Sequence, residues 1–142
     1  MDRDDVTRWL DAYFDAWQSN HPDDVASLFA PDATYAVSPF VKPWRGRDEI
    51  VRRWTAGAGT KLWHSYTVLA TGDSLAVAHW AVAVRLPGGQ VTELDGIPVL
   101  TFNDAGECVE HREWYVERPV PGGAPRPQGG AQRPPPRGRP RT

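Results

Sequence analysis

Apolar residues follow a helical period in the first part of this chain and a strand period in the second. In residues 4–19 they recur every three or four positions, which is typical of a helix with one buried face. These positions are Val6, Trp9, Leu10, Tyr13, Phe14 and Trp17. A second helix is predicted from Pro22, because proline suits the first helical turn, through Phe29. A third helix is predicted over Arg47–Ala56.

Runs rich in Val, Thr, Trp and Tyr, bounded by Gly, Pro, Asn and Asp, predict strands in the rest of the chain. A short strand is expected at Thr34–Val37 and a longer one at Lys61–Ala70. Residues 75–117 have the pattern of three antiparallel strands joined by turns at 87–90 and 103–106. Three N-terminal helices packed on a curved antiparallel sheet form an α+β fold.

Side chains alternate between the two faces of a strand, so the turns determine which residues share a face. We take 72–73 and 88–89 as two-residue turns and 103–106 as a four-residue loop. One face then carries His64, Ala81, Gly96 and Glu113 in one row, Tyr66, His79, Pro98 and His111 in the next, and Ala83, Leu94 and Tyr115 beyond. The opposite face carries Trp63, Trp80 and Trp114, with Asp95 within reach of Arg112. The first face carries small side chains and titratable ones, and the second carries large aromatic side chains.

Charge and composition narrow the function classes. The chain has 142 residues, 16 basic and 18 acidic, but residues 119–142 hold five arginines and no acid. Residues 1–118 therefore carry 11 basic against 18 acidic groups, a net charge of −7, which argues against nucleic-acid binding. The single cysteine, Cys108, excludes an internal disulfide, and no apolar window reaches the roughly 18 residues of a membrane span. We expect a soluble cytoplasmic protein with one domain over 1–118, followed by a disordered Pro/Gly/Arg-rich tail over 119–142.

The phrases LFAPDATY, WRGRDEIV, GDSLAVAHW and DGIPVLTFNDAGECVEHREWY, in this order of helices and strands, resemble the NTF2-like (SnoaL-like) superfamily. The resemblance covers residues 4–118. It implies a cone-shaped pocket closed by the helices over the concave face of the sheet, with an outer face that often dimerises. Relatives include ketosteroid isomerases, scytalone dehydratases, polyketide cyclases, limonene epoxide hydrolases and non-catalytic transport factors.

The resemblance places four catalytic candidates in that pocket. His79 and His64 fall where scytalone dehydratase-like members carry histidines, and Glu113 falls at the acidic general base of epoxide hydrolase-like members. Tyr13 falls at the oxyanion-binding tyrosine of ketosteroid isomerase-like members. Each family pattern is incomplete. The epoxide hydrolase pattern needs Arg and Asp where this chain has His79 and Ala81, and the isomerase acids map to Val37 and Pro98.

Two functions follow as hypotheses, with an epoxide hydrolase-like reaction as a further alternative. The first is a cofactor-independent dehydratase, cyclase or isomerase acting on an apolar ring compound such as a polyketide, terpenoid or steroid-like molecule, with His79 moving the proton. The second is a non-catalytic ligand-binding or dimerisation module. The expected substrate-binding residues are Trp17, Tyr35, Trp54, Tyr66, Leu94, Pro98, His111 and Tyr115. We expect neither a metal nor a cofactor, because the histidines and Glu113 are too widely spaced to share one ion. A homodimer through the Trp63, Trp80 and Trp114 face is predicted.

Overall fold

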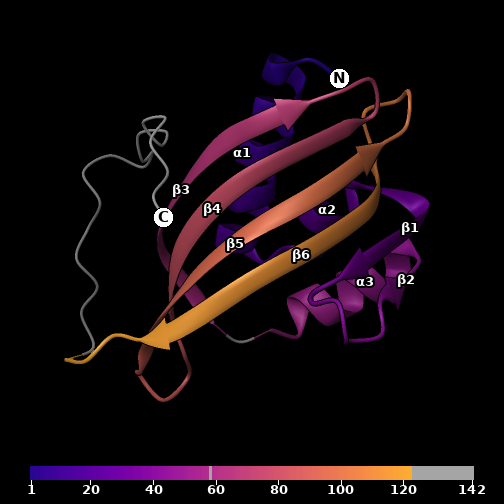
Figure 1. The fold of residues 1–142 in the computed structure, drawn as a ribbon. Coiled ribbons are helices and arrows are strands. Elements are labelled where there is room, and N and C mark those ends of the chain that lie inside the picture. Colours follow the sequence, from indigo (N-terminus) through magenta and orange to yellow (C-terminus); the bar gives the residue numbers. More distant parts are fainter. Residues whose placement is uncertain (58, 123–142) are drawn as a thin grey trace.

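The computed structural model describes residues 1–57 and 59–122, so most of the predicted tail lies outside the described residues. The helices are α1 (Arg3–Ser19), α2 (Pro22–Ala26) and α3 (Arg47–Thr55). The strands are β1 (Phe29–Ala36), β2 (Trp44–Arg45), β3 (Thr60–Thr71), β4 (Leu75–Arg85), β5 (Val91–Phe102) and β6 (Cys108–Pro119). Figure 1 shows the four long strands β3 to β6 side by side, with α1 crossing behind them.

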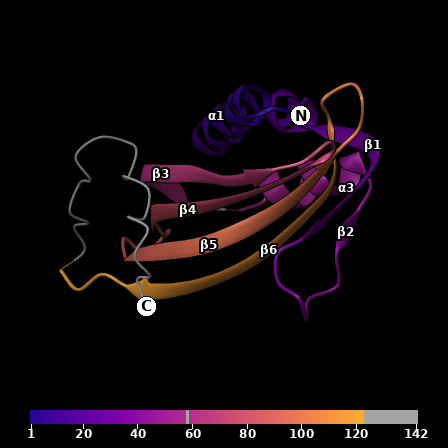
Figure 2. The same cartoon turned by 45° about the horizontal axis from the view of Figure 1, so that its top comes forward.

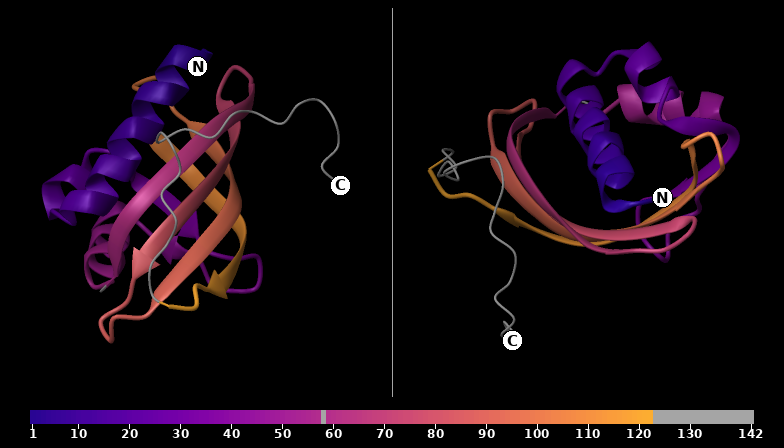
Figure 3. Two further views of the ribbon diagram at one scale, coloured as in Figure 1. Left: turned by 90° about the vertical axis from the view of Figure 1, so that its left-hand side faces the viewer. Right: turned by 90° about the horizontal axis from the view of Figure 1, so that it is seen from above.

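All six strands form one sheet in the order β2-β1-β6-β5-β4-β3. Strand β1 pairs with β6 in parallel, and the other neighbours are antiparallel, so the sheet is mixed rather than purely antiparallel. Seen from above, the sheet curves like a trough and α1 lies inside the curve (Figure 3). In Figure 2, α1 covers the β3 side of the trough, while α3 and β1 stand at its other end. The predicted α+β fold with helices on a curved sheet is confirmed.

The apolar stripe of α1 forms the centre of the core between helix and sheet. Val6 and Phe14 are fully buried, and Leu10 is nearly so. The helix begins with a capping box, in which Asp2 and Asp5 satisfy each other's free backbone N–H groups. It ends at Asn20, whose φ of 53° is left-handed. The sequence therefore determines both ends of α1 and its buried face locally.

The predicted second helix is too long. Helix α2 ends at Ala26, and Phe29 begins strand β1 instead of closing a helical turn. The Cys108 N–H donates to the Leu28 carbonyl at 3.0 Å, and Phe29 pairs with Cys108 in β6. Pairing with a strand about eighty residues away in the sequence thus overrides the local helical pattern.

The register of β4 differs from the prediction. Trp80 pairs with Tyr66 on one side and with Gly96 on the other, and Gly96 pairs in turn with Tyr115. Trp80 therefore faces into the trough, and its neighbour His79 faces outward. Strands β3, β5 and β6 keep the faces predicted for them, so β4 alone is inverted.

Two errors of one residue produced this inversion. The β4–β5 hairpin has a three-residue loop, because the Leu86 N–H donates to Gln90 and the Gly89 N–H to Leu86. Gly89 adopts the positive φ of 92° that such a loop requires. Between β3 and β4, an irregularity between Val68 and Ala70 shifts the register by one residue. Each shift exchanges the two faces of β4 relative to a neighbouring strand, so β3 and β5 keep the same faces relative to each other and only β4 is reversed. At Gly96–Pro98 the pairing with β6 is continuous.

The convex face is consequently less aromatic than predicted. Trp80 is only 1% exposed and lies on the concave side, whereas Trp114 is 44% exposed and lies outside, 5.6 Å below the Arg112 guanidinium. Trp63 is partly buried opposite Ala83 on the convex face. The homodimer stays a prediction, and its proposed interface would contain Trp63 and Trp114 but not Trp80.

Gly96 allows the Trp80 indole to lie flat against β5. A β-carbon built at Gly96 would lie 3.0 Å from Trp80 Cη2 and 2.8 Å from Tyr115 Cβ. We expect Gly96→Ala to lower the free energy of unfolding by about 1–3 kcal/mol through this overpacking, measured by urea denaturation. Gly88→Ala, in the open hairpin loop with no atom within 4 Å of the added carbon, is the control. An equal effect at both glycines would contradict the close contact at Gly96.

Candidate functional site

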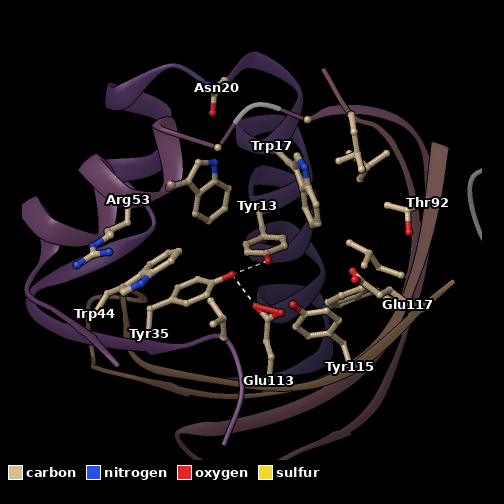
Figure 4. Close-up of a pocket in the computed structure, with 18 residues that line it drawn as sticks. Tyr13, Trp17, Asn20, Tyr35, Trp44, Arg53, Thr92, Glu113, Tyr115 and Glu117 are labelled. Atoms are coloured by element: carbon tan, nitrogen blue, oxygen red, sulfur yellow. Dashed lines mark hydrogen bonds between the residues drawn. The ribbon is translucent and has the colours of Figure 1, made fainter. Parts of the chain in front are cut away.

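A cavity of about 330 Å³ opens between the helices and the concave face of the sheet. Figure 4 shows its residues converging from α1, from the β1 and α3 side, and from the outer halves of β4 to β6. Its walls are mainly aromatic and aliphatic, and one carboxylate lies on its floor. The lining residues are Tyr13, Trp17, Asn20, Tyr35, Val37, Trp44, Arg53, Trp54, Gly57, Gly59, Trp80, Val84, Leu86, Thr92, Leu94, Glu113, Tyr115 and Glu117. Such an apolar hollow with a few polar groups is typical of a small-molecule site.

The carboxylate on the floor belongs to Glu113, which is only 6% exposed. The Tyr35 hydroxyl donates to Glu113 Oε1 at 2.6 Å, and the Tyr13 hydroxyl lies 2.9 Å from the Tyr35 hydroxyl (Figure 4). Because Tyr35 uses its hydrogen on Glu113, Tyr13 is the donor in the second bond. Within the described residues Glu113 Oε2 makes no hydrogen bond. The network therefore fixes one carboxylate oxygen and leaves the other available to a ligand.

His111 is the second support of Glu113. Its Nε2 lies 2.9 Å from Glu113 Oε1, and its ring is stacked 4.0 Å from Tyr35 and 5.5 Å from Tyr13. The side chain is buried, and its Nδ1 has no partner in the described part of the chain. A neutral ring with the proton on Nε2 satisfies this geometry, since a second N–H on Nδ1 would be buried without an acceptor. His111 thus orients Glu113 from behind and does not line the cavity.

The two tyrosines of this network keep their protons over a wide pH range. Burial raises the pKa of Tyr35 and of Tyr13 well above the ordinary value, and the nearby Glu113 charge raises both further. Both groups therefore act as O–H donors. Tyr115, at the cavity edge, also has a pKa raised by burial. Its hydroxyl makes no hydrogen bond within residues 1–57 and 59–122.

These raised pKa values predict a loss of stability in alkali. In the unfolded chain Tyr13 and Tyr35 ionise near pH 10.0, whereas in the folded chain they remain protonated. The folded state then binds more protons, so the free energy of unfolding falls as pH rises above about 10, by about 1 kcal/mol per tyrosine and pH unit. Urea denaturation at about pH 9 and pH 11 measures this slope. Tyr35→Phe should reduce the slope, and the half-exposed Tyr115→Phe should reduce it less; an unchanged slope in Tyr35→Phe would contradict the assignment.

His79, the predicted proton carrier, is not in the cavity. It faces the convex side of β4, where its Nε2 lies 2.7 Å from Asp95 Oδ1. The prediction was wrong because the β4 register is inverted. Asp95 was correctly placed on the outer face, but its partner there is His79; Arg112 instead lies 4.0 Å from Glu110.

His64 and Tyr66 lie on the concave face, but under α1 and away from the cavity. The His64 ring stacks on Phe14 at 4.3 Å, and its Nδ1 lies 3.0 Å from Lys61 Nζ. Tyr66 donates its hydroxyl hydrogen to Asp11 of α1 at 2.6 Å. Burial, and next the Lys61 charge, lower the pKa of His64. Both side chains therefore attach α1 to β3, and neither lines the cavity.

The remaining candidate residues fall into two groups, those that line the cavity and those that do not. Tyr13, Trp17, Tyr35, Trp54, Leu94, Glu113 and Tyr115 line the cavity, whereas Pro98 and His111 do not. What these residues do chemically stays a prediction. Sequence reasoning missed Trp80, Trp44 and Arg53. The alternation of β4 contained the signal for Trp80. Trp44 lies outside the predicted strands, and Arg53 lies in the predicted helix Arg47–Ala56 with no feature that distinguishes it there.

Other kinds of site find no support in the described residues. No group of three His, Cys, Asp or Glu side chains there could hold a metal ion. Cys108 is fully buried, and burial raises the pKa of its thiol to about 12, so it is not a nucleophile in the folded chain. None of the described helices has the length and apolar composition needed to cross a membrane.

A family model described as a SnoaL-like domain matches residues 10–111. This match spans more than half of the chain, and the chain therefore belongs to the SnoaL-like family, within the NTF2-like superfamily. No curated protein sequence matches it.

Two solved structures show the same fold. One is SalBIII, described as an epoxide hydrolase/cyclase-like enzyme in pyran ring formation in the polyether salinomycin. It has a TM-score of 0.68 and 15% identity, over 81% of this chain and 93% of that one. The other is an LEH-like epoxide hydrolase of M. tuberculosis, with a TM-score of 0.64 and 15% identity over 79% of this chain and 83% of that one. At this identity the likeness concerns the fold alone.

Proposed function

We propose that this protein is a cofactor-independent enzyme of the dehydratase, cyclase or isomerase type that acts on an apolar ring compound. Glu113 is the proposed general base. It takes a proton from a carbon next to a carbonyl group of the substrate, and the substrate becomes an enolate. The observation that carries the proposal is a buried carboxylate with one oxygen held by Tyr35 and His111 and the other left unbonded at an apolar cavity.

Proton removal next to a carbonyl is the first step common to all three reaction types. In an isomerisation the enolate takes this proton back from Glu113 at another carbon. In a dehydration it expels a hydroxyl group, which leaves as water with the proton from Glu113. In a cyclisation it attacks a second carbonyl, whose oxygen then takes that proton. The Tyr115 hydroxyl, which keeps its proton and lines the cavity, is the proposed donor to the enolate oxygen. Tyr35 and Tyr13 line the cavity, and their proposed catalytic role is to position the Glu113 carboxylate through the chain of hydrogen bonds.

Epoxide opening is the second candidate, since both similar solved structures are described as epoxide hydrolase-like. The residues that β4 contributes to the cavity argue against epoxide opening. Trp80 and Val84 line the cavity from this strand, where the epoxide hydrolase-like pattern carries Arg and Asp. An epoxy alcohol in the substrate panel, assayed in ¹⁸O-labelled water, tests this reaction separately.

Hydrogen–deuterium exchange tests the main proposal without knowledge of the natural substrate. The wild-type protein is incubated in D2O with a panel of ring ketones and hydroxy-ketones, and ¹H NMR follows deuterium uptake next to the carbonyl. We expect exchange with at least one ketone, and its loss in Glu113→Gln. Binding without exchange or turnover across the panel would favour the non-catalytic ligand-binding module.

A further inference from the structure

Arg53 is the positively charged residue of the cavity lining, and no carboxylate forms a close hydrogen-bonded ion pair with it in the described part of the chain. Arg53, in the last turn of α3, extends a guanidinium group to the cavity wall. Its nearest charge partner is Glu49, with Arg53 Nε 3.6 Å from Glu49 Oε2. This distance is too long for a hydrogen bond, and Arg53 makes no other side-chain contact of this kind within the described residues. The Arg53 side chain is 56% exposed, and its planar fork of N–H donors can therefore bind a ligand at this wall of the cavity.

The other charges of the cavity lie away from Arg53. Glu113 is on the floor and Glu117 is on the far side, and Figure 4 shows Arg53 and Glu117 on opposite sides of the hollow. An anionic group on a ligand is repelled by the two glutamates and attracted to the arginine. The cavity therefore has a cationic and an anionic side, and it orients a ligand that carries a negative charge.

The wall next to Arg53 suits a flat ring. Trp44 stacks on Tyr35 at 5.0 Å with an interplanar angle of 19°, and Trp54 meets Tyr35 edge to face at 6.1 Å. Figure 4 shows the Arg53 guanidinium next to Trp44. A ring that packs against these aromatics lies between Arg53 and the Glu113 carboxylate.

We propose that the substrate is an apolar ring compound with a carboxylate side group, and that Arg53 is the specificity residue that binds this carboxylate. The proposal rests on the function assigned above, in which the cavity takes a ring compound. Arginine binds carboxylates through two parallel N–H···O bonds, and these are among the stronger hydrogen bonds in proteins. The carboxylate at Arg53 would hold the uncharged ring, with its reacting carbon, toward Glu113.

Calorimetric titration with two matched ligands tests this assignment. The probes are 2-naphthylacetate and its uncharged analogue 2-naphthylacetamide, which differ in charge and little in shape. We expect the wild-type protein to bind the carboxylate about three- to fivefold more tightly than the amide, since Arg53 is partly exposed to solvent. Arg53→Gln should abolish this preference, chiefly by weakening the binding of the carboxylate. Arg52→Gln, at the neighbouring exposed position outside the cavity lining, should keep the preference.

The outcomes separate this proposal from the proposed catalysis. Because the assay measures binding, the preference and its loss in Arg53→Gln would stand even if no ketone exchanged deuterium. Glu113→Gln should retain the preference for the carboxylate. A wild-type protein without preference, or a preference that survives Arg53→Gln, would overturn the role of Arg53, whatever the exchange assay shows.

Discussion

Glu113→Gln is expected to lower the turnover rate by about 10²–10⁴-fold, the usual contribution of a positioned general base. The amide keeps the size of the side chain, and its oxygen can still accept from Tyr35 and His111, so the fold should survive. What it loses is the ability to take a proton. Rates of deuterium uptake by the best ring ketone of the panel, at saturating concentration, measure the effect.

Glu117→Gln is the matched control for this prediction. Glu117 lies on the same strand and lines the same cavity, but its side chain is exposed and makes no hydrogen bond within the described residues. We expect a change of less than about threefold, since a solvent-exposed charge is screened. Equal losses in both variants would show that the rate follows the charge of the cavity rather than a base at position 113.

Trp80→Ala is expected to lower the free energy of unfolding by about 3–5 kcal/mol, the cost typical of deleting a buried aromatic side chain. Trp80 is 1% exposed, meets Trp17 edge to face at 6.2 Å and lies against Gly96. Its removal leaves a void that joins the ligand cavity, so ligand binding should fail as well. Urea denaturation at one low protein concentration measures the change in stability.

Trp114→Ala provides the comparison within one residue type. Trp114 is 44% exposed on the convex face, where the Arg112 guanidinium lies over its ring. We expect a loss of about 1 kcal/mol or less, from the exposed cation–π contact and partial burial. A large effect at Trp114 with a small one at Trp80 would contradict the register of β4.

Most of the fold could be predicted from the sequence because its signals are local. The stripe of apolar residues in α1, the third helix and the long strands each have a clear period. Strand β2 could not be predicted, since two residues are too few to show a strand period. The start of β1 could not be predicted either, since Phe29 adopts strand conformation through pairing with Cys108, which is distant in the sequence.

The site was harder to predict than the fold. The sequence identifies Glu113, Tyr13 and Tyr35 as candidates. Their hydrogen-bond network, however, depends on the parallel pairing of β1 with β6, and no turn in the sequence indicates this pairing. His79 was chosen instead because a three-residue loop at Gly89 and an irregularity near Leu69 are invisible to a count of alternating positions. A shift of one residue reverses both faces of a strand, so the error placed a surface histidine in the cavity and a cavity tryptophan on the surface.

The proposed catalysis depends on a proton-moving group that projects into the cavity from β6 rather than from β4. The most direct test compares two variants, His79→Ala and Glu113→Gln, in one assay of deuterium uptake by the same ring ketone, with circular dichroism to verify the fold. We predict that His79→Ala keeps the wild-type rate within about twofold, because His79 faces the convex side of β4, away from the cavity, where it lies 2.7 Å from Asp95. Glu113→Gln should lose at least about 10²-fold. Loss of activity in His79→Ala with activity retained in Glu113→Gln would contradict the account.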